Sequence, residues 1–405
     1  MRRTPLLFAL LIAFSTAGHP ARAQKPKDEP KRPRLPVGVD TNNAQVYYDL
    51  GLDKLDRDPE QAADAFYWAS RINPTSADAY YARRCALLLS DRYRFQKYEM
   101  GDRRTLQSDE IKRIDSLYYY SLTINPFLYR KLDVRLFHSF ISNIADEYAR
   151  RDRNLSANEV QYVIEREIAH ASAGMQAWQA YGEGRFTDAL RLYGDAIKDA
   201  RYKAGYRTDR GRLFFQLDQS DSALTELTQA VDELRKTEKK DLVYVYESKA
   251  LLEHSIGLVQ QRLGNVAAAK ESFGRALQED LSYFPAHVQL GYIALEAKDT
   301  TTALSEMDLA VQIRADDPTL RYIYGYTLAV SGKYKDAEEQ LRKAIEVNPV
   351  FAAPYHVLGQ VLDGQGKAVE ARAQYQSFLL RASQQDMRRK EAEERLRELA
   401  AKNDR

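Results

Sequence analysis

The chain has 405 residues, of which 44% are hydrophobic and 29% are charged, a charge content that excludes a polytopic membrane protein. Its 60 Lys and Arg residues nearly balance 58 Asp and Glu residues, so nucleic acid is not expected as a partner. A single cysteine excludes an intrachain disulfide framework and a thiolate zinc cluster. The length fits two to four domains or one array of repeats.

Residues 1–23 have the three-part pattern of a secretory signal peptide. Arg2 and Arg3 precede an uncharged apolar stretch over 5–17, and small residues follow at the cleavage positions. We expect cleavage near Ala23-Gln24 and a periplasmic or secreted protein. An uncleaved anchor is the alternative, but the apolar stretch is shorter than the about 20 residues that a span requires. No membrane span is therefore expected in the mature chain, while peripheral association with the envelope stays open.

The segment 24–42 holds four prolines among lysines, arginines and acids. Such a segment has few apolar groups to bury, so ordering it would not offset the lost entropy. We expect a disordered proline-rich tether, with a proline-rich ligand for a partner as the alternative.

The sequence pattern of residues 43–169 indicates divergent helical repeats. Asn73-Pro74 and Asn125-Pro126 end two helical units, and the second requires an insertion near 91–108. The inserted residues mix cations with aromatic side chains, which could bind acidic surfaces, but interspersed acids favour a solvated loop. Ser156 and Glu159 have capping-box spacing at a helix start.

The strongest signal is an internal repeat in the second half of the chain, with a constant period of about 34 residues. Each unit has a glycine, an alanine twelve residues later, and a large apolar residue one helical turn after the alanine. The three series are Gly257, Gly291, Gly325 and Gly359; Ala269, Ala303, Ala337 and Ala371; and Phe273, Met307, Leu341 and Tyr375. Small residues let two helices approach closely where they cross, and the large residue fills the space beside them. Strand alternation is absent, so the fold class is expected to be all-α.

This periodicity resembles the tetratricopeptide repeat, whose slots are met by Tyr324-Gly325, Ala337, Leu341, Ala344 and Pro349. The resemblance implies a right-handed superhelical solenoid of antiparallel helix pairs, most regular over 170–385, with first helices lining an inner groove. Residues 386–405 predict a C-terminal capping helix, since one side is apolar and the other charged.

Residues for catalysis or cofactor binding are not evident. Glu167 and His170 have the spacing of a di-iron ligand pair, but the second pair and further acids are missing. Cys85 lies in an apolar stretch, which favours a buried structural thiol over a nucleophile. We therefore expect no catalytic, cofactor or metal residues, and no enzyme.

Family geometry places aromatic and polar side chains near the groove, where they could bind a protein or peptide ligand. The candidate partner-binding residues are Trp178, Tyr292, Tyr322, Tyr326, His356 and Gln360. The groove lacks the Lys and Asn pattern by which some relatives clamp a C-terminal carboxylate. The function expected is an exported, non-enzymatic interaction scaffold or assembly factor. The alternative is an enzyme or glycan-binding protein built on the same repeats.

Overall fold

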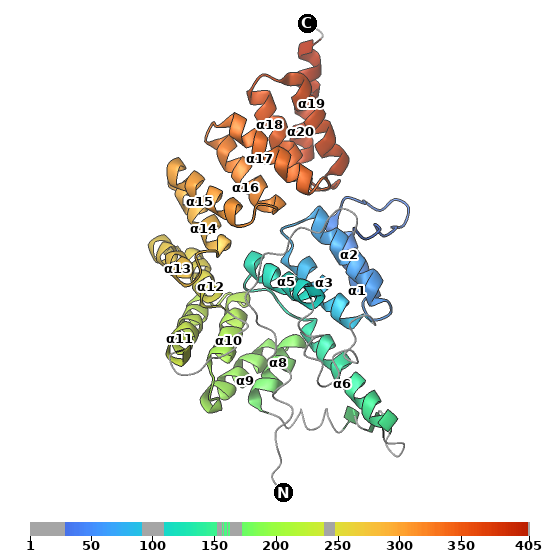
Figure 1. Ribbon diagram of the computed structural model, residues 1–405, viewed down its shortest axis with the longest axis vertical. Coiled ribbons are helices and arrows are strands. Elements are labelled where there is room, and N and C mark those ends of the chain that lie inside the picture. Colours follow the sequence, from blue (N-terminus) through green and yellow to red (C-terminus); the bar gives the residue numbers. More distant parts are fainter. Residues whose placement is uncertain are drawn as a thin grey trace. The chain divides into compact units, whose positions relative to one another are not determined.

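The computed structural model describes residues 29–90, 109–151, 156, 158–159, 161–162, 172–238 and 248–403. Within these residues every regular element is a helix and none is a strand (Figure 1). The all-helical fold class is thereby confirmed. The chain divides into two compact units, one formed by residues 126–283 and the other by 22–125 together with 284–405.

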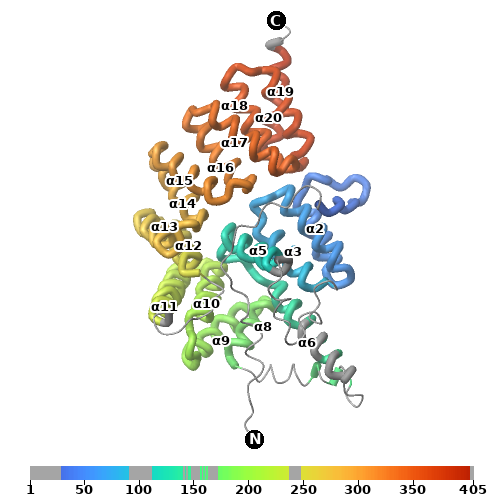
Figure 2. The backbone as a smooth tube through the Cα atoms, viewed as in Figure 1, coloured from blue at the N-terminus to red at the C-terminus, as the bar shows by residue number. Residues whose placement is uncertain are grey.

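The first unit, residues 126–283, consists of consecutive helices that pack in pairs. Its helices are α6 (Asp133–Arg151), α8 (Ala173–Gly182), α9 (Phe186–Asp199), α10 (Ala204–Gln216), α11 (Ser220–Glu238), α12 (Lys249–Arg262) and α13 (Val266–Glu279). Their course can be followed in the tube trace (Figure 2).

The second unit combines helices from both ends of the sequence. From residues 22–125 it takes α1 (Ala44–Lys54), α2 (Pro59–Ile72), α3 (Ala77–Leu89) and α5 (Asp109–Ile124). From residues 284–405 it takes α14 (Phe284–Glu296), α15 (Thr300–Ile313), α16 (Pro318–Val330), α17 (Tyr334–Val347), α18 (Ala353–Gly364), α19 (Ala368–Arg381) and α20 (Arg388–Asn403).

The glycine of each repeat lies where the two helices of a pair cross, as the spacing predicted. A Cβ atom placed on Gly325 would lie 2.8 Å from Cγ of Leu341, and one on Gly257 would lie 2.4 Å from Cε1 of Phe273. The repeat alanines are fully buried, among them Ala337. Paired helices approach this closely only because these positions carry no larger side chain.

A residue with positive φ links the two helices of each repeat. Gly264 and Gly332 have φ of 79° and 75°, and Lys298 occupies the same position with φ of 60°. A left-handed residue at this point ends the first helix and lets the chain reverse.

Residues 29–42 contain no helix, but their side chains are held against α1 and α2. The indole of Trp68 donates to the carbonyl of Pro30 at 3.0 Å. The guanidinium of Arg32 lies 5.0 Å from the Trp68 ring and donates to the Tyr47 hydroxyl at 2.9 Å. A mobile tether would lack such contacts. Here an arginine stacked on aromatic rings gives the segment specific partners.

Polar contacts join the two stretches of the second unit. The Asp40 carboxylate accepts from the Ser383 hydroxyl at 2.8 Å and from the Gln384 amide at 2.7 Å, between α19 and α20. The Asn348 side chain donates to the carbonyl of Arg71 at 2.7 Å. Residues from the N-terminal helices and the C-terminal repeats thus belong to one compact unit.

The buried Asp317 makes another of these contacts. Its carboxylate accepts a hydrogen bond of 2.7 Å from the Tyr120 hydroxyl of α5 while capping the backbone of α16. The guanidinium of Arg314 lies over the Tyr120 ring. Burial, together with the charge of Asp317, raises the pKa of Tyr120 well above its usual value, so this hydroxyl remains a donor.

Some predictions concern residues outside the described part. They are the signal peptide over 1–23, the insertion near 91–108, and the pair Glu167 and His170. The capping box lies within the described part and is confirmed. The Ser156 amide donates to the Glu159 carboxylate, and the Glu159 amide donates to the Ser156 hydroxyl.

Candidate functional site

Five of the six candidate partner-binding residues lie on the first helices of three repeats in the second unit. Tyr292 is on α14, Tyr322 and Tyr326 are on α16, and His356 and Gln360 are on α18. Tyr322 and Tyr326 are four residues apart on α16, so they lie one turn apart along one side of this helix.

The structure brings Tyr292, Tyr322 and Tyr326 close together, and we call these three residues the tyrosine face. Burial and the neighbouring Tyr322 and Tyr326 hydroxyls raise the pKa of Tyr292 to about 12. Tyr326 is 43% exposed, whereas the other two rings are half-buried. None of the three hydroxyls makes a hydrogen bond to a described residue, so all remain able to bind a ligand.

One edge of the tyrosine face packs against Phe351 and lies within the electrostatic reach of Arg388, the first residue of α20. The Tyr322 ring meets Phe351 edge-on, with ring centroids 5.3 Å apart. The positive charge of Arg388 acts on the Tyr322 hydroxyl, although burial still raises the pKa of Tyr322. Arg388 itself is held by Asp386 through two hydrogen bonds of 2.6 and 2.9 Å. A fixed cation therefore borders the aromatic surface.

His356 differs from the other candidates because it lies in the core. It is only 4% exposed, and its ring lies 5.0 Å from that of Phe378. Burial lowers the pKa of His356, and its Nε2 atom is 3.5 Å from the Glu391 carboxylate of α20. In this structure α20 borders the histidine, so its ring does not form part of an open groove.

Gln360 is exposed but already engaged by the C-terminal helix. Its side-chain amide donates to Oε1 of Glu391 at 2.8 Å. Trp178, the sixth candidate, belongs to α8 in the first unit, where its half-buried ring meets Phe137 edge-on at 5.3 Å. The six residues are therefore grouped only in part.

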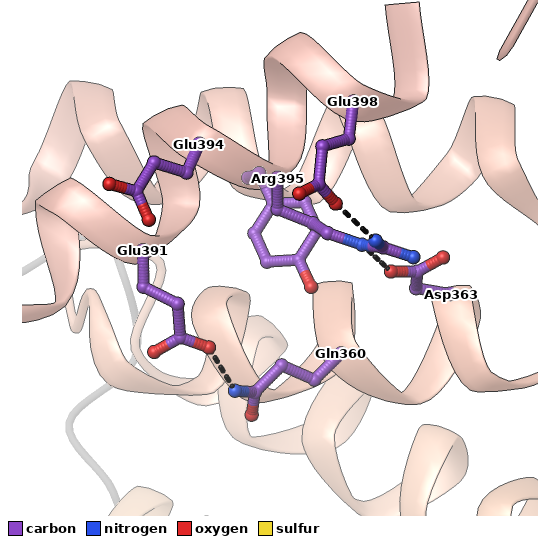
Figure 3. A pocket seen from close by; sticks show the side chains of 7 residues that line it. Gln360, Asp363, Glu391, Glu394, Arg395 and Glu398 are labelled. Carbon is purple, nitrogen blue, oxygen red and sulfur yellow. Dashed lines mark hydrogen bonds and ion pairs between the residues drawn. The ribbon is translucent and has the colours of Figure 1, made fainter.

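A small acidic pocket lies between α18 and α20, next to Gln360 (Figure 3). Its volume is about 300 Å³. Gln360 and Asp363 come from α18 and Tyr375 from α19, while α20 adds Glu391, Glu394, Arg395 and Glu398. Sequence reasoning treated α20 only as a cap, although the three glutamates recur at helical spacing and so share one face.

The C-terminal helix also covers the core, as its apolar side predicted. Ala392 and Leu399 are buried in one cluster with Leu358 and Phe378. The polar side of α20 carries the pocket glutamates, so one helix both closes the core and forms an acidic surface.

Neither a metal site nor a membrane span is found in the described ranges. No group of three or more His, Cys, Asp or Glu side chains there is arranged to hold a metal ion. No helix among those residues is both long and apolar enough to cross a bilayer. Cys85 is buried, in agreement with a structural thiol.

Comparison with known protein families identifies the repeats. A family described as tetratricopeptide repeat matches residues 175–236, 255–318 and 325–386. These three segments match tetratricopeptide repeats. The three tetratricopeptide matches cover the part of the chain in which the repeat spacing is most regular, and the prediction of such repeats is confirmed there. No curated protein matches the sequence.

Three solved structures to which this chain is similar are described as follows. The C-terminal part of a repeat-containing protein from Cytophaga hutchinsonii is 14% identical, with a TM-score of 0.43 over 50% of this chain and 77% of that chain. YrrB, described as having an unusual peptide-binding site, is 18% identical, with a TM-score of 0.36 over 49% and 95%. MamA from Desulfovibrio magneticus is 18% identical, with a TM-score of 0.37 over 44% and 93%.

Proposed function

We propose that the protein is an exported, non-enzymatic interaction scaffold or assembly factor that binds a protein or peptide through the tyrosine face. The observation that carries the proposal is the grouping of Tyr292, Tyr322 and Tyr326 with three unpartnered hydroxyls. Tyrosine combines apolar contact area with a polar tip, which suits protein interfaces.

The tyrosine face favours an extended segment or helix as the bound element. Its residues come from α14 and α16, the first helices of two adjacent repeats, so a ligand can contact both repeats at once. The rings would supply apolar contact, and the hydroxyls would fix the orientation of the ligand. No nucleic-acid ligand is proposed, because the near balance of charges does not favour one.

The test compares partner capture from the native envelope fraction by the unaltered protein and by the double variant Tyr322→Ala and Tyr326→Ala. Tyr334→Ala is the matched control, since Tyr334 is 40% exposed and lies in the same unit outside the face. The protein set captured by wild type should be retained by the control and lost from the double variant. Equal capture by a folded double variant would move the site away from the tyrosine face.

A second measurement keeps the test decisive if the double variant does not fold. Tyr322 packs against Phe351 and its loss opens the core, whereas Tyr326 is more exposed. Tyr326→Ala alone should keep its helical circular dichroism and still weaken capture. Undiminished capture by Tyr326→Ala would count against the face.

Export is tested separately by mass spectrometry of the protein isolated from its native host. The signal-peptide pattern of residues 1–23 supports a mature terminus at Gln24. An intact terminus at Met1 would contradict the periplasmic or secreted location.

A further inference from the structure

The acidic pocket between α18 and α20 has more negative charge than its own residues neutralise. Four carboxylates line it, against the single guanidinium of Arg395. Arg395 is committed to two of these acids, since it pairs with Asp363 and with Glu398. The remaining pair, Glu391 and Glu394, has no strong cationic partner within the pocket.

The surroundings of Glu391 and Glu394 satisfy them only in part. Glu391 accepts one hydrogen bond from Gln360 and lies 3.5 Å from His356, whose pKa is lowered by burial. Among the described residues the ion-pair partner of Glu394 is Lys390, at 4.0 Å on an exposed stretch of the same helix. Exposed pairs of this kind contribute little, so both carboxylates keep capacity to accept further hydrogen bonds.

Tyr375 supplies an independent indication of a ligand. Its side chain is 2% exposed, it lines the pocket, and its hydroxyl has no hydrogen-bond partner among the described residues. Packing holds the Tyr375 ring in place, because the ring fills the space beside Gly359 and contacts the buried His356 ring edge-on. The hydroxyl oxygen is accessible from the pocket, where water or a ligand can bind it.

The potential at the Tyr375 hydroxyl indicates the charge of the missing partner. Burial raises the pKa of Tyr375, the carboxylates of Asp363 and Glu391 raise it further, and the Arg395 guanidinium opposes them in part. A cation placed beside the hydroxyl would meet its oxygen together with the free oxygens of Glu391 and Glu394. An ammonium group has three donors and no acceptor, which matches three acceptors around one space.

We propose that the pocket formed by Tyr375, Glu391 and Glu394 binds a primary alkylammonium group, the side chain of a lysine on a protein partner. The volume of about 300 Å³ is at the lower end for a ligand site, which suits one side chain rather than a whole peptide. A metal ion is a poorer fit, since the carboxylates of the described chain form no metal-binding group. This site is distinct from the tyrosine face and does not depend on that proposal.

The test measures binding of acetyl-Gly-Lys-Gly-amide to the full chain by ligand-observed nuclear magnetic resonance. The same tripeptide acetylated on the lysine side chain is the neutral probe, and it should show no binding because it lacks the charge. Affinity for the charged tripeptide should fall as salt is added. Absence of binding by the unaltered protein, or equal binding of the acetylated tripeptide, would overturn the proposal.

The most informative variant is Tyr375→Phe, because it removes only the hydroxyl. We expect about tenfold weaker binding, as for loss of one hydrogen bond to a charged group, with thermal stability unchanged. Lower thermal stability would show that the hydroxyl has a structural partner and would overturn the assignment.

Two further variants separate the pocket from general surface charge. Glu394→Gln should weaken binding about tenfold, whereas Glu393→Gln, the neighbouring residue on α20 outside the pocket, should leave it within about twofold. Equal effects of the two changes would mean non-specific attraction and would overturn the proposal.

The n-butylammonium ion distinguishes the source of the amine. It carries the same group without a peptide backbone. Tighter binding of the tripeptide supports a lysine of a protein, while tighter binding of n-butylammonium assigns the same pocket to a free amine and overturns the protein source.

Discussion

Lys298 occupies a backbone conformation that the equivalent residues of neighbouring repeats achieve with glycine. Its φ is 60°, and Gly264 and Gly332, one repeat away on either side, have φ of 79° and 75°. A side chain in this left-handed region costs roughly 1–2 kcal/mol. The repeat thus keeps its turn geometry at the expense of local strain.

Lys298→Gly should therefore stabilise the protein by about 1 kcal/mol, measured by urea unfolding. The matched control is Lys270→Gly, an exposed position inside α13, which should destabilise by about 1 kcal/mol. A destabilising Lys298→Gly change would contradict the strain argument.

His254 makes stability depend on pH. Burial lowers the pKa of this histidine to about 3, against about 6.5 in an unfolded chain. Its contribution is therefore complete above pH 6.5 and is lost as the pH falls toward 3, because the unfolded chain binds a proton that the folded chain lacks.

Between pH 7 and pH 5, His254→Gln should lose about 1–2 kcal/mol less stability than the unaltered protein. Urea unfolding at both pH values measures the difference, and parallel losses in the two proteins would refute the role of His254.

At the scale of the helix pair, much of the structure was predictable from sequence. The glycines and alanines lie where two helices touch, and these two helices are consecutive in the chain. The spacing of the small residues alone therefore locates each crossing. The crossing of α1 and α2 was missed, although a Cβ on Gly51 would lie 2.5 Å from Cε1 of Phe66. Here the step from the glycine to the aromatic residue is one position shorter than in the regular units, which breaks the strict repeat.

The crossing itself can be tested by one substitution at two glycines. Gly325→Ala should destabilise by about 1–3 kcal/mol, because the new Cβ would lie 2.8 Å from Leu341. Gly274→Ala should stabilise by about 1 kcal/mol, since that helical position has nothing within 4 Å. Thermal or urea unfolding reports both, and effects of equal sign would mean that the crossing is misplaced.

The candidate site was predictable only where it follows the repeat. Tyr292 and Tyr326 are one full repeat apart, and this spacing predicted that the residues of the tyrosine face lie close together. The burial of His356 and the engagement of Gln360 were not foreseen, because both depend on where α20 packs. The position of a residue within a repeat does not predict its contacts with α20, because α20 is not part of the repeat pattern.

At the scale of the whole molecule, the second unit joins stretches that are far apart in sequence. Asp40 and Gln384 are 344 positions apart, and Tyr120 and Asp317 are 197 apart. Sequence periodicity describes local stacking, so it could not indicate this pairing. For the same reason the contacts of residues 29–42 were not predicted. The prolines of this segment suggested disorder, but Arg32 has partners on α1 and α2.

The contact between Tyr120 and Asp317 should contribute to the stability of this unit. Tyr120→Phe removes a buried donor to a carboxylate and should destabilise by about 1–3 kcal/mol in urea unfolding. The control is Tyr334→Phe, since the Tyr334 hydroxyl has no hydrogen-bond partner among the described residues, and its effect should be near zero. A neutral Tyr120→Phe change would show that the two stretches do not share this bond.

The pairing of both ends also bears on how the protein is made. A ribosome completes α1 to α5 long before it reaches α14, so the carboxylate of Asp40 and the hydroxyl of Tyr120 must wait for their partners. Closing so long a loop is entropically costly, and chains rich in distant contacts fold slowly. The stacked pairs α8–α9, α10–α11 and α12–α13 require only neighbours and can form as they emerge. The middle of the chain is therefore expected to fold early, and the first helices are expected to be the last to reach their final surroundings.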